Sequence, residues 1–336
     1  MSEDPIQKVL EAVDDYEQAV NVSLSFVHIY LWDKSSNALL AGSSFGLGWL
    51  YQPGNVTPDI TIRLPSNAGI VAELKISLPK NDDSAVGDKW EDKFDQLRKY
   101  DVQLRGWDGK DAVVAQQELV LLVDQKLVRR VIDYMSSKGT HYNQHSKNFA
   151  VIQYSPATGV KDGLFMRLEH GAMDDHNGVT MSRLRDGIAV SFEYLFSSGL
   201  SRIELLDYKP PVVYLMTLLW DKVFNVLVTP EQWDEARLRG GKRILPVVVT
   251  PSQLRDFLVK NFADKSSCQS FKQKWVEEAL DCFVKLKLAE KVEKTDRYLI
   301  KYRKTINTDV KDGNKHRVFA QALYSPGSQA RLEKFT

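Results

Sequence analysis

Two apolar segments joined by a turn constrain the fold of this chain more than any other feature. Residues 58–77 have the sequence PDITIRLPSNAGIVAELKIS, in which apolar residues alternate with polar ones on both sides of SNAG. Asn and Gly favour a tight turn between such segments. The pattern predicts a β-hairpin that closes near Asn67. Asp59, at the start of the first strand, would then lie across from Glu73 and Lys75, near the end of the second.

The charged residues of the second strand indicate chemistry. Glu73 and Lys75 stand in an apolar run, and burying them without partners would be costly. Two neighbouring carboxylates repel each other unless a cation lies between them, and Mg²⁺ (or Mn²⁺) prefers oxygen ligands. Such a cation would activate a water for attack on a phosphate, and Lys75 would hold that water or stabilise the transition state. The alternative is a surface hairpin with a cross-strand ion pair, which contributes little to stability.

The next segment supports the chemical interpretation. Residues 89–101 (KWEDKFDQLRKYD) predict a helix, with Gln96 and Tyr100 four residues apart on one face. Together, Pro58-Asp59, Glu73-Leu74-Lys75 and this Gln-x-x-x-Tyr pair resemble the PD-(D/E)xK nuclease superfamily, in particular its RecB-like branch. The resemblance covers residues 1–155.

The resemblance implies a role for each matched residue. It makes Asp59, Glu73 and the Leu74 carbonyl metal ligands, with Mg²⁺ or Mn²⁺ as the cofactor. It makes Lys75 catalytic, and it gives the Gln-x-x-x-Tyr pair the task of orienting the site or touching the substrate strand.

The family commonly adds an acidic residue from the preceding helix. Residues 5–28 predict that helix, and Glu17 lies on its apolar stripe. Glu17 is therefore the candidate for the extra carboxylate. The alternative is a residue at the edge of the buried face that extends to water.

The remaining patterns complete a restriction-endonuclease-like α/β domain, a mixed sheet flanked by helices. We expect strands at 45–51, 117–124 and 149–155, and a helix over 124–139. Residues 156–208 predict a small α/β extension or insert, with strands at 163–170 and 201–208 and a helix at 182–196. Two polar clusters, 140–145 and 169–178, contain His and Asp, but their turn-forming residues favour surface loops over a second metal site.

Residues 209–306 predict a second, mainly helical domain. Its order is an apolar helix (212–228), a short strand (243–249), a helix with Thr250 as N-cap, a helix over 270–292 and a hairpin over 292–304. This order resembles a winged helix, which implies DNA contacts from the third helix and the wing. The basic residues that would contact phosphates are Lys272, Lys274, Lys291, Lys294, Arg297, Lys301, Arg303 and Lys304. The acidic residues on the third helix leave a protein-docking role open.

Composition sets the outer limits. The chain has 336 residues, enough for two or three domains, and contains no apolar run long enough to span a membrane. Its acidic N-terminus resembles no signal peptide, and Cys268 and Cys282 suggest no disulfide framework, which favours a reducing, cytoplasmic setting. Residues 1–100 hold 15 acidic and 9 basic side chains, whereas 285–336 hold 6 and 13. The last stretch, 307–336, predicts a basic polar tail.

These patterns together predict a metal-dependent deoxyribonuclease of a defence, mobile-element or repair system, with DNA as its partner and no membrane. A homodimer or a partner ATPase or helicase subunit would fit this function. Two other functions remain open. One is a catalytically weak nucleic-acid-binding subunit of a larger complex, and the other is a winged-helix transcription regulator.

Overall fold

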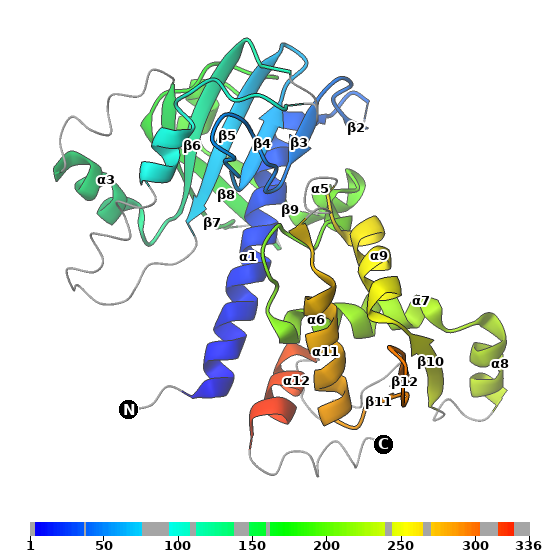
Figure 1. The fold of residues 1–336 in the computed structure, drawn as a ribbon. Coiled ribbons are helices and arrows are strands. Elements are labelled where there is room, and N and C mark those ends of the chain that lie inside the picture. Colours follow the sequence, from blue (N-terminus) through cyan, green and yellow to red (C-terminus); the bar gives the residue numbers. More distant parts are fainter. Residues whose placement is uncertain are drawn as a thin grey trace. The chain divides into compact units, whose positions relative to one another are not determined.

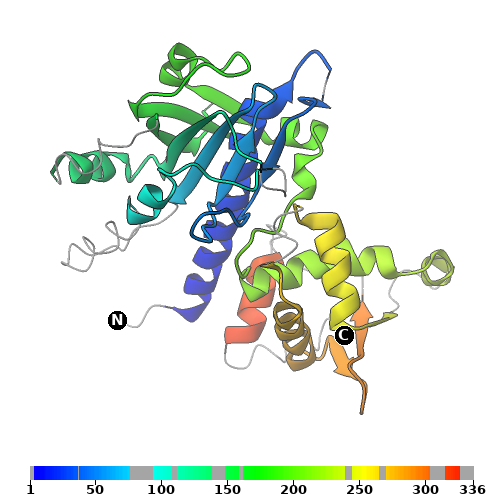
Figure 2. The same ribbon diagram turned by 45° about the horizontal axis from the view of Figure 1, so that its top comes forward.

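The structure is a computed structural model of the chain. It describes residues 4–36, 38–75, 94–107, 112–137, 148–158, 162–238, 244–264, 270–302 and 315–325. The chain divides into two compact units. The larger unit contains residues 18–207 and 264–269, and the smaller contains 1–17, 208–263 and 270–336. Both are shown as ribbons in Figure 1 and Figure 2.

A seven-stranded mixed sheet forms the centre of the larger unit. Its strands, in spatial order, are β3 (Ser44–Gly46), β4 (Ile60–Arg63), β5 (Ala68–Lys75), β6 (Gln116–Asp124), β7 (Phe149–Pro156), β8 (Gly163–Gly171) and β9 (Ile188–Ser191). The three central strands β5, β6 and β7 are parallel, and the outer neighbours pair antiparallel. The expected α/β class, with a mixed sheet flanked by helices, is confirmed.

Helices pack on both faces of this sheet. In the described ranges, the larger unit contains the second half of α1 (Pro5–Leu31), a helical turn at 94–99, α3 (Val128–Ser137), α4 (Met181–Asp186), α5 (Phe192–Ser197) and the short η2 (Leu200–Arg202). The strands β1 (Trp32–Asp33) and β2 (Ala38–Leu39) form a separate small sheet. Alternation along β5 and β6 directs Val71 and Leu119 to a core that also contains Val131 of α3. The opposite face bears Glu118, near Tyr30 of α1. In Figure 1, this part of α1 lies against the strands.

The predicted hairpin is confirmed, and its register is set by the turn. Ile60 pairs with Ala72 and Ile62 with Ile70. Asn67 adopts a left-handed conformation (φ 65°), which Asn tolerates better than most residues. The turn therefore ends one residue before β5 begins, close to the predicted position.

Three expectations for the secondary structure of the larger unit were wrong in detail. The predicted helix over 182–196 is interrupted, because Gly187 (φ 96°) ends α4 and the next residues form β9 along the edge of β8. The strand expected at 201–208 overlaps the 3₁₀ turn η2 at its start. The strand expected at 45–51 is limited to β3, since Gly48 (φ 69°) turns the backbone away from the sheet direction.

The smaller unit combines helices with a three-stranded antiparallel sheet. Its elements are α6 (Val212–Leu218), the π-helical turn η3 (Leu219–Phe224), α7 (Asn225–Leu227), α8 (Pro230–Leu238), β10 (Leu245–Val249), α9 (Pro251–Phe262), α11 (Gln273–Lys285), β11 (Ala289–Lys291), β12 (Tyr298–Tyr302) and α12 (Lys315–Tyr324). The strand order is β10-β12-β11. The helix expected over 270–292 is shorter than predicted, because Lys287 (φ 59°) breaks it and the chain enters β11.

Aromatic side chains form the core of this unit. The Trp220 ring lies 5.6 Å from Phe283 and 6.1 Å from Phe319, measured between ring centroids. Thr250 caps α9 in a full capping box with Gln253, as its position before Pro251 predicted. The first half of α1 also belongs here, since Tyr16 packs 4.7 Å from Tyr214.

Among the helices in the described ranges, none is both long and apolar enough to cross a membrane.

Candidate functional site

The hairpin brings Asp59 and Glu73 together. Because Ile60 pairs with Ala72, the two acidic residues are the next opposed pair along the strands. The Leu74 N–H donates a 2.7 Å hydrogen bond to Asp59 Oδ2, which fixes the Asp59 carboxylate against the end of β5. The Asp59 carboxylate is close enough for its charge to raise the pKa of Glu73.

Glu73 is held from the following helix. Its side chain is only 1% exposed. Its Oε1 accepts a 2.6 Å hydrogen bond from the Tyr100 hydroxyl and a 3.1 Å bond from Gln96 Nε2, and Gln96 also donates to the Tyr100 oxygen at 2.9 Å. The helical turn at residues 94–99 is anchored by Phe94 and Leu97, both buried against the sheet. The Gln-x-x-x-Tyr pair therefore orients Glu73.

The other oxygen of Glu73 is unusual. In the described part of the chain, Oε2 is buried and has no hydrogen-bond partner. Burial raises the pKa of Glu73 well above its usual value, and the nearby charge of Asp59 raises it further. A buried carboxylate oxygen without a donor, beside a second carboxylate, is an electrostatic arrangement that a divalent cation would relieve. The residues present therefore fit a Mg²⁺ ion held by Asp59 and Glu73.

Lys75 lies two residues further along β5, on the same face as Glu73. It is 8% exposed, and its positive charge acts to lower the Glu73 pKa. The Tyr154 hydroxyl donates a 2.9 Å hydrogen bond to the Lys75 carbonyl and so fixes the end of the strand. The structure thus gathers Asp59, Glu73 and Lys75 in one place, with the Leu74 backbone between them.

Asp207 is an acidic neighbour that the sequence analysis missed. Burial and the charge of Asp59 raise its pKa to about 6. Its carboxyl group packs against Gly48, at the position that a Gly48 Cβ would take. Asp207 is far from the hairpin in sequence, within a segment that was expected to be an ordinary strand, so alternation gave no signal for it.

Glu17 has a different setting. It belongs to the smaller unit, where its carboxylate lies 2.9 Å from His316 Nε2 of α12. Nothing in this contact tests its expected role as the extra carboxylate.

The predicted phosphate-contacting residues are mostly on the surface of the smaller unit. Exposed residues of this set are Lys272, Lys274, Lys291, Lys294 and Arg297. Lys291 also lies 5.3 Å from the centre of the Tyr298 ring, and Lys301 pairs with Glu290. Arg303 and Lys304 lie outside the described residues.

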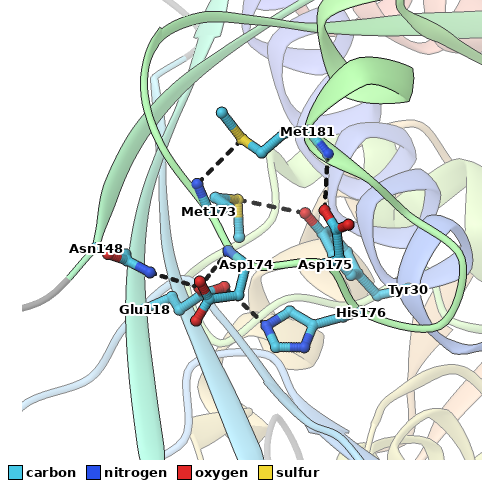
Figure 3. A network of polar contacts seen from close by, with 8 residues as sticks. All are labelled: Tyr30, Glu118, Asn148, Met173, Asp174, Asp175, His176 and Met181. Carbon is cyan, nitrogen blue, oxygen red and sulfur yellow. Dashed lines mark hydrogen bonds and ion pairs between the residues drawn. The ribbon is translucent and has the colours of Figure 1, made fainter.

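A second polar network lies on the opposite face of the sheet (Figure 3). Glu118 of β6 is fully buried, yet both its oxygens have donors. Oε1 accepts from the Asp174 N–H at 2.7 Å and from Asn148 Nδ2 at 3.2 Å, and Oε2 lies 3.1 Å from His176 Nε2. The hydrogen bond to Glu118 raises the pKa of His176. Part of the 169–178 cluster is therefore tied to the sheet; the other cluster, 140–145, lies outside the described residues.

Across the ranges that the structure describes, no three His, Cys, Asp or Glu side chains gather closely enough to hold a metal ion by themselves. A cation between Asp59 and Glu73 would need further ligands from backbone carbonyl and water, which is ordinary for Mg²⁺. Comparisons with protein-family models, with curated proteins and with solved structures gave no match for this chain.

Proposed function

We propose that this protein is a Mg²⁺-dependent nuclease that hydrolyses phosphodiester bonds in DNA. One observation carries the proposal. The buried Glu73 carboxylate is held through Oε1 by Tyr100 and Gln96, while Oε2 is without a donor in the described part of the chain and lies beside Asp59. A purely structural carboxylate is normally satisfied on both oxygens, as Glu118 is.

The proposed roles follow from the positions of the side chains. When bound, Mg²⁺ would supply Lewis-acid activation of water and of the phosphate. Asp59 and Glu73 would hold the ion together with the Leu74 carbonyl. The Lys75 ammonium would stabilise charge on the phosphate, and Tyr100 and Gln96 would keep Glu73 in one rotamer.

The order of elements supports the same proposal. A helix, an antiparallel β3-β4-β5 meander, the helical turn at 94–99 and the parallel strand β6 follow the order of the PD-(D/E)xK core. In the smaller unit, α6, β10, α9, α11 and the β11–β12 hairpin follow the order of a winged helix, with exposed lysines at the start of α11 and in the hairpin. A winged helix in the same chain as a nuclease core favours duplex DNA as the substrate. The role in defence, mobile elements or repair rests on analogy.

The same exposed lysines keep a non-catalytic function open. A DNA-binding subunit or transcription regulator would use the α11 and hairpin surface and would not require the carboxylate pair. Duplex binding that is unchanged in a Glu73→Gln variant, without any cleavage by the wild type, would favour that function.

The test is cleavage of supercoiled plasmid and of single-stranded DNA with Mg²⁺ or Mn²⁺, or with EDTA. We expect metal-dependent cleavage by the wild type and none by Glu73→Gln or Lys75→Ala. Lys126→Ala removes the same charge at an exposed site and is the matched control, which should cleave normally. Absence of cleavage together with absence of metal binding would refute the proposal.

A further inference from the structure

Asp207 approaches the Asp59–Glu73 site from a distant part of the chain. Gly48 follows β3, and its N–H donates a 3.2 Å hydrogen bond to the Asp59 carbonyl. A Cβ on Gly48 would lie 2.0 Å from Asp207 Cγ, so the Asp207 carboxyl group occupies the space beside this glycine. Gly48 thus contacts both the backbone of Asp59 and the side chain of Asp207.

Structural roles explain this placement poorly. In the described part of the chain, the one donor to the Asp207 carboxylate is its own backbone N–H. The group is half-buried and faces the charge of Asp59, so in the metal-free protein it adds repulsion. Asp264, also from a distant segment, differs in this respect, because it accepts a hydrogen bond from the Leu47 N–H at 3.2 Å.

The site also contains a buried polar atom that a cation would satisfy. Glu73 Oε2 is buried and has no partner among the described residues. Two carboxylates and one carbonyl leave most positions around a Mg²⁺ ion to water, and such waters need acceptors of their own. In the described ranges, no three acidic side chains form a ligand group for a metal ion, so a direct bond from Asp207 to the cation is not assigned.

We propose that Asp207 is the third carboxylate of this site and binds the hydrated divalent cation through its water molecules. This inference rests on the function proposed above and assigns a positioning role to a residue outside the hairpin. It also explains the small residue at position 48. Any side chain there would displace the Asp207 carboxylate, and the φ of 69° is strained for residues other than glycine.

The test is calorimetric titration of Mn²⁺ into the full chain. Asp207→Asn keeps the shape of the side chain and removes its charge, and Asp186→Asn makes the same change at an exposed position of α4. We expect Asp207→Asn to weaken Mn²⁺ binding by about 10-fold or more, the range for residues that support a metal from outside its ligand set. Asp186→Asn should bind as the wild type does, and Glu73→Gln should not bind.

A second measurement separates positioning from structure. In EDTA, Asp207→Asn should unfold at a higher temperature than the wild type, because repulsion with Asp59 is removed. Weaker Mn²⁺ binding with higher metal-free stability supports the inference. If Asp207→Asn binds Mn²⁺ as tightly as the wild type while Glu73→Gln does not bind, the inference is overturned and the nuclease proposal stands. If the wild type does not bind Mn²⁺, both fall.

Discussion

Two buried glutamates of the same sheet should respond in opposite ways to the same substitution. In metal-free protein, we expect Glu73→Gln to increase the free energy of unfolding. The glutamine oxygen can keep both hydrogen bonds from Tyr100 and Gln96. In the wild type, Asp59 faces the Glu73 carboxylate, whereas in the variant the glutamine amide group can donate to Asp59. The substitution therefore removes a repulsion and satisfies an atom that has no donor in the described chain.

The size of the effect follows from the cost of an unsatisfied buried polar group, about 1–3 kcal/mol. For a domain of this size, each kcal/mol shifts the melting temperature by roughly 2–4 °C. An increase of about 2–12 °C is therefore expected when melting is followed in EDTA. Adding Mg²⁺ should stabilise the wild type through binding and leave Glu73→Gln unchanged.

The dependence on pH gives a sharper signature. The pKa of Glu73 is raised in the folded state above its ordinary value of 4.5. The contribution of the protonated Glu73 side chain to the free energy of unfolding is therefore fully present below about pH 4.5. This contribution is lost as the pH rises through the folded pKa. The stability advantage of Glu73→Gln should be small at pH 4.5 and should grow toward neutral pH.

Glu118 is the matched control, because it is equally buried and its oxygens have three donors. Glu118→Gln places an amide against some of these donors and removes the charge that faces His176. Breaking a buried pair in this way costs about 3–5 kcal/mol. If Glu73→Gln in EDTA proves less stable than the wild type at pH 7, the argument that Glu73 awaits a cation is wrong.

Three further outcomes can be checked. Tyr100→Phe removes the 2.6 Å hydrogen bond to Glu73, which is worth about 1.5–3 kcal/mol for a charged acceptor. The Mn²⁺ affinity measured by calorimetry should therefore fall about 10-fold or more. An unchanged affinity would show that Tyr100 does not orient Glu73. The pKa of His176 is raised in the folded state, so its contribution to the free energy of unfolding is present below about pH 6.5 and is lost above the folded pKa. In urea unfolding, the difference in this free energy between wild type and His176→Asn should be larger at pH 5.5 than at pH 9. A difference that stays constant with pH would contradict the pairing with Glu118. Thr250→Ala removes the cap of α9 and should cost about 1 kcal/mol in urea unfolding followed by circular dichroism, whereas Thr250→Ser should retain most of the stability.

Local patterns predicted the parts of the fold that local physics determines. The hairpin followed from alternation and an Asn turn, and the α9 start followed from Thr250 and Pro251. The order of Asp59, Glu73 and the Gln-x-x-x-Tyr pair placed them in one site, because a hairpin and the next helix bring neighbouring segments together.

Long-range contacts were beyond such patterns. Asp207 reaches Gly48, and His176 reaches Glu118, only through the tertiary arrangement of the sheet. Helix ends were also missed where a single backbone angle decides them, as at Gly187 and Lys287. After each of these positions the chain leaves the helix and pairs with a neighbouring strand, and residue type alone does not specify where that pairing begins.

The division of α1 between two units sets an order for folding. Residues 18–207 contain all seven strands of the larger sheet, so most of this unit has been synthesised before residue 208 leaves the ribosome. The smaller unit has no such early start. Tyr16 needs Tyr214, and Glu17 meets His316, 299 residues later in the chain. Its first helical turns therefore meet Tyr214 only after about two thirds of the chain has been synthesised, and His316 near the end of synthesis.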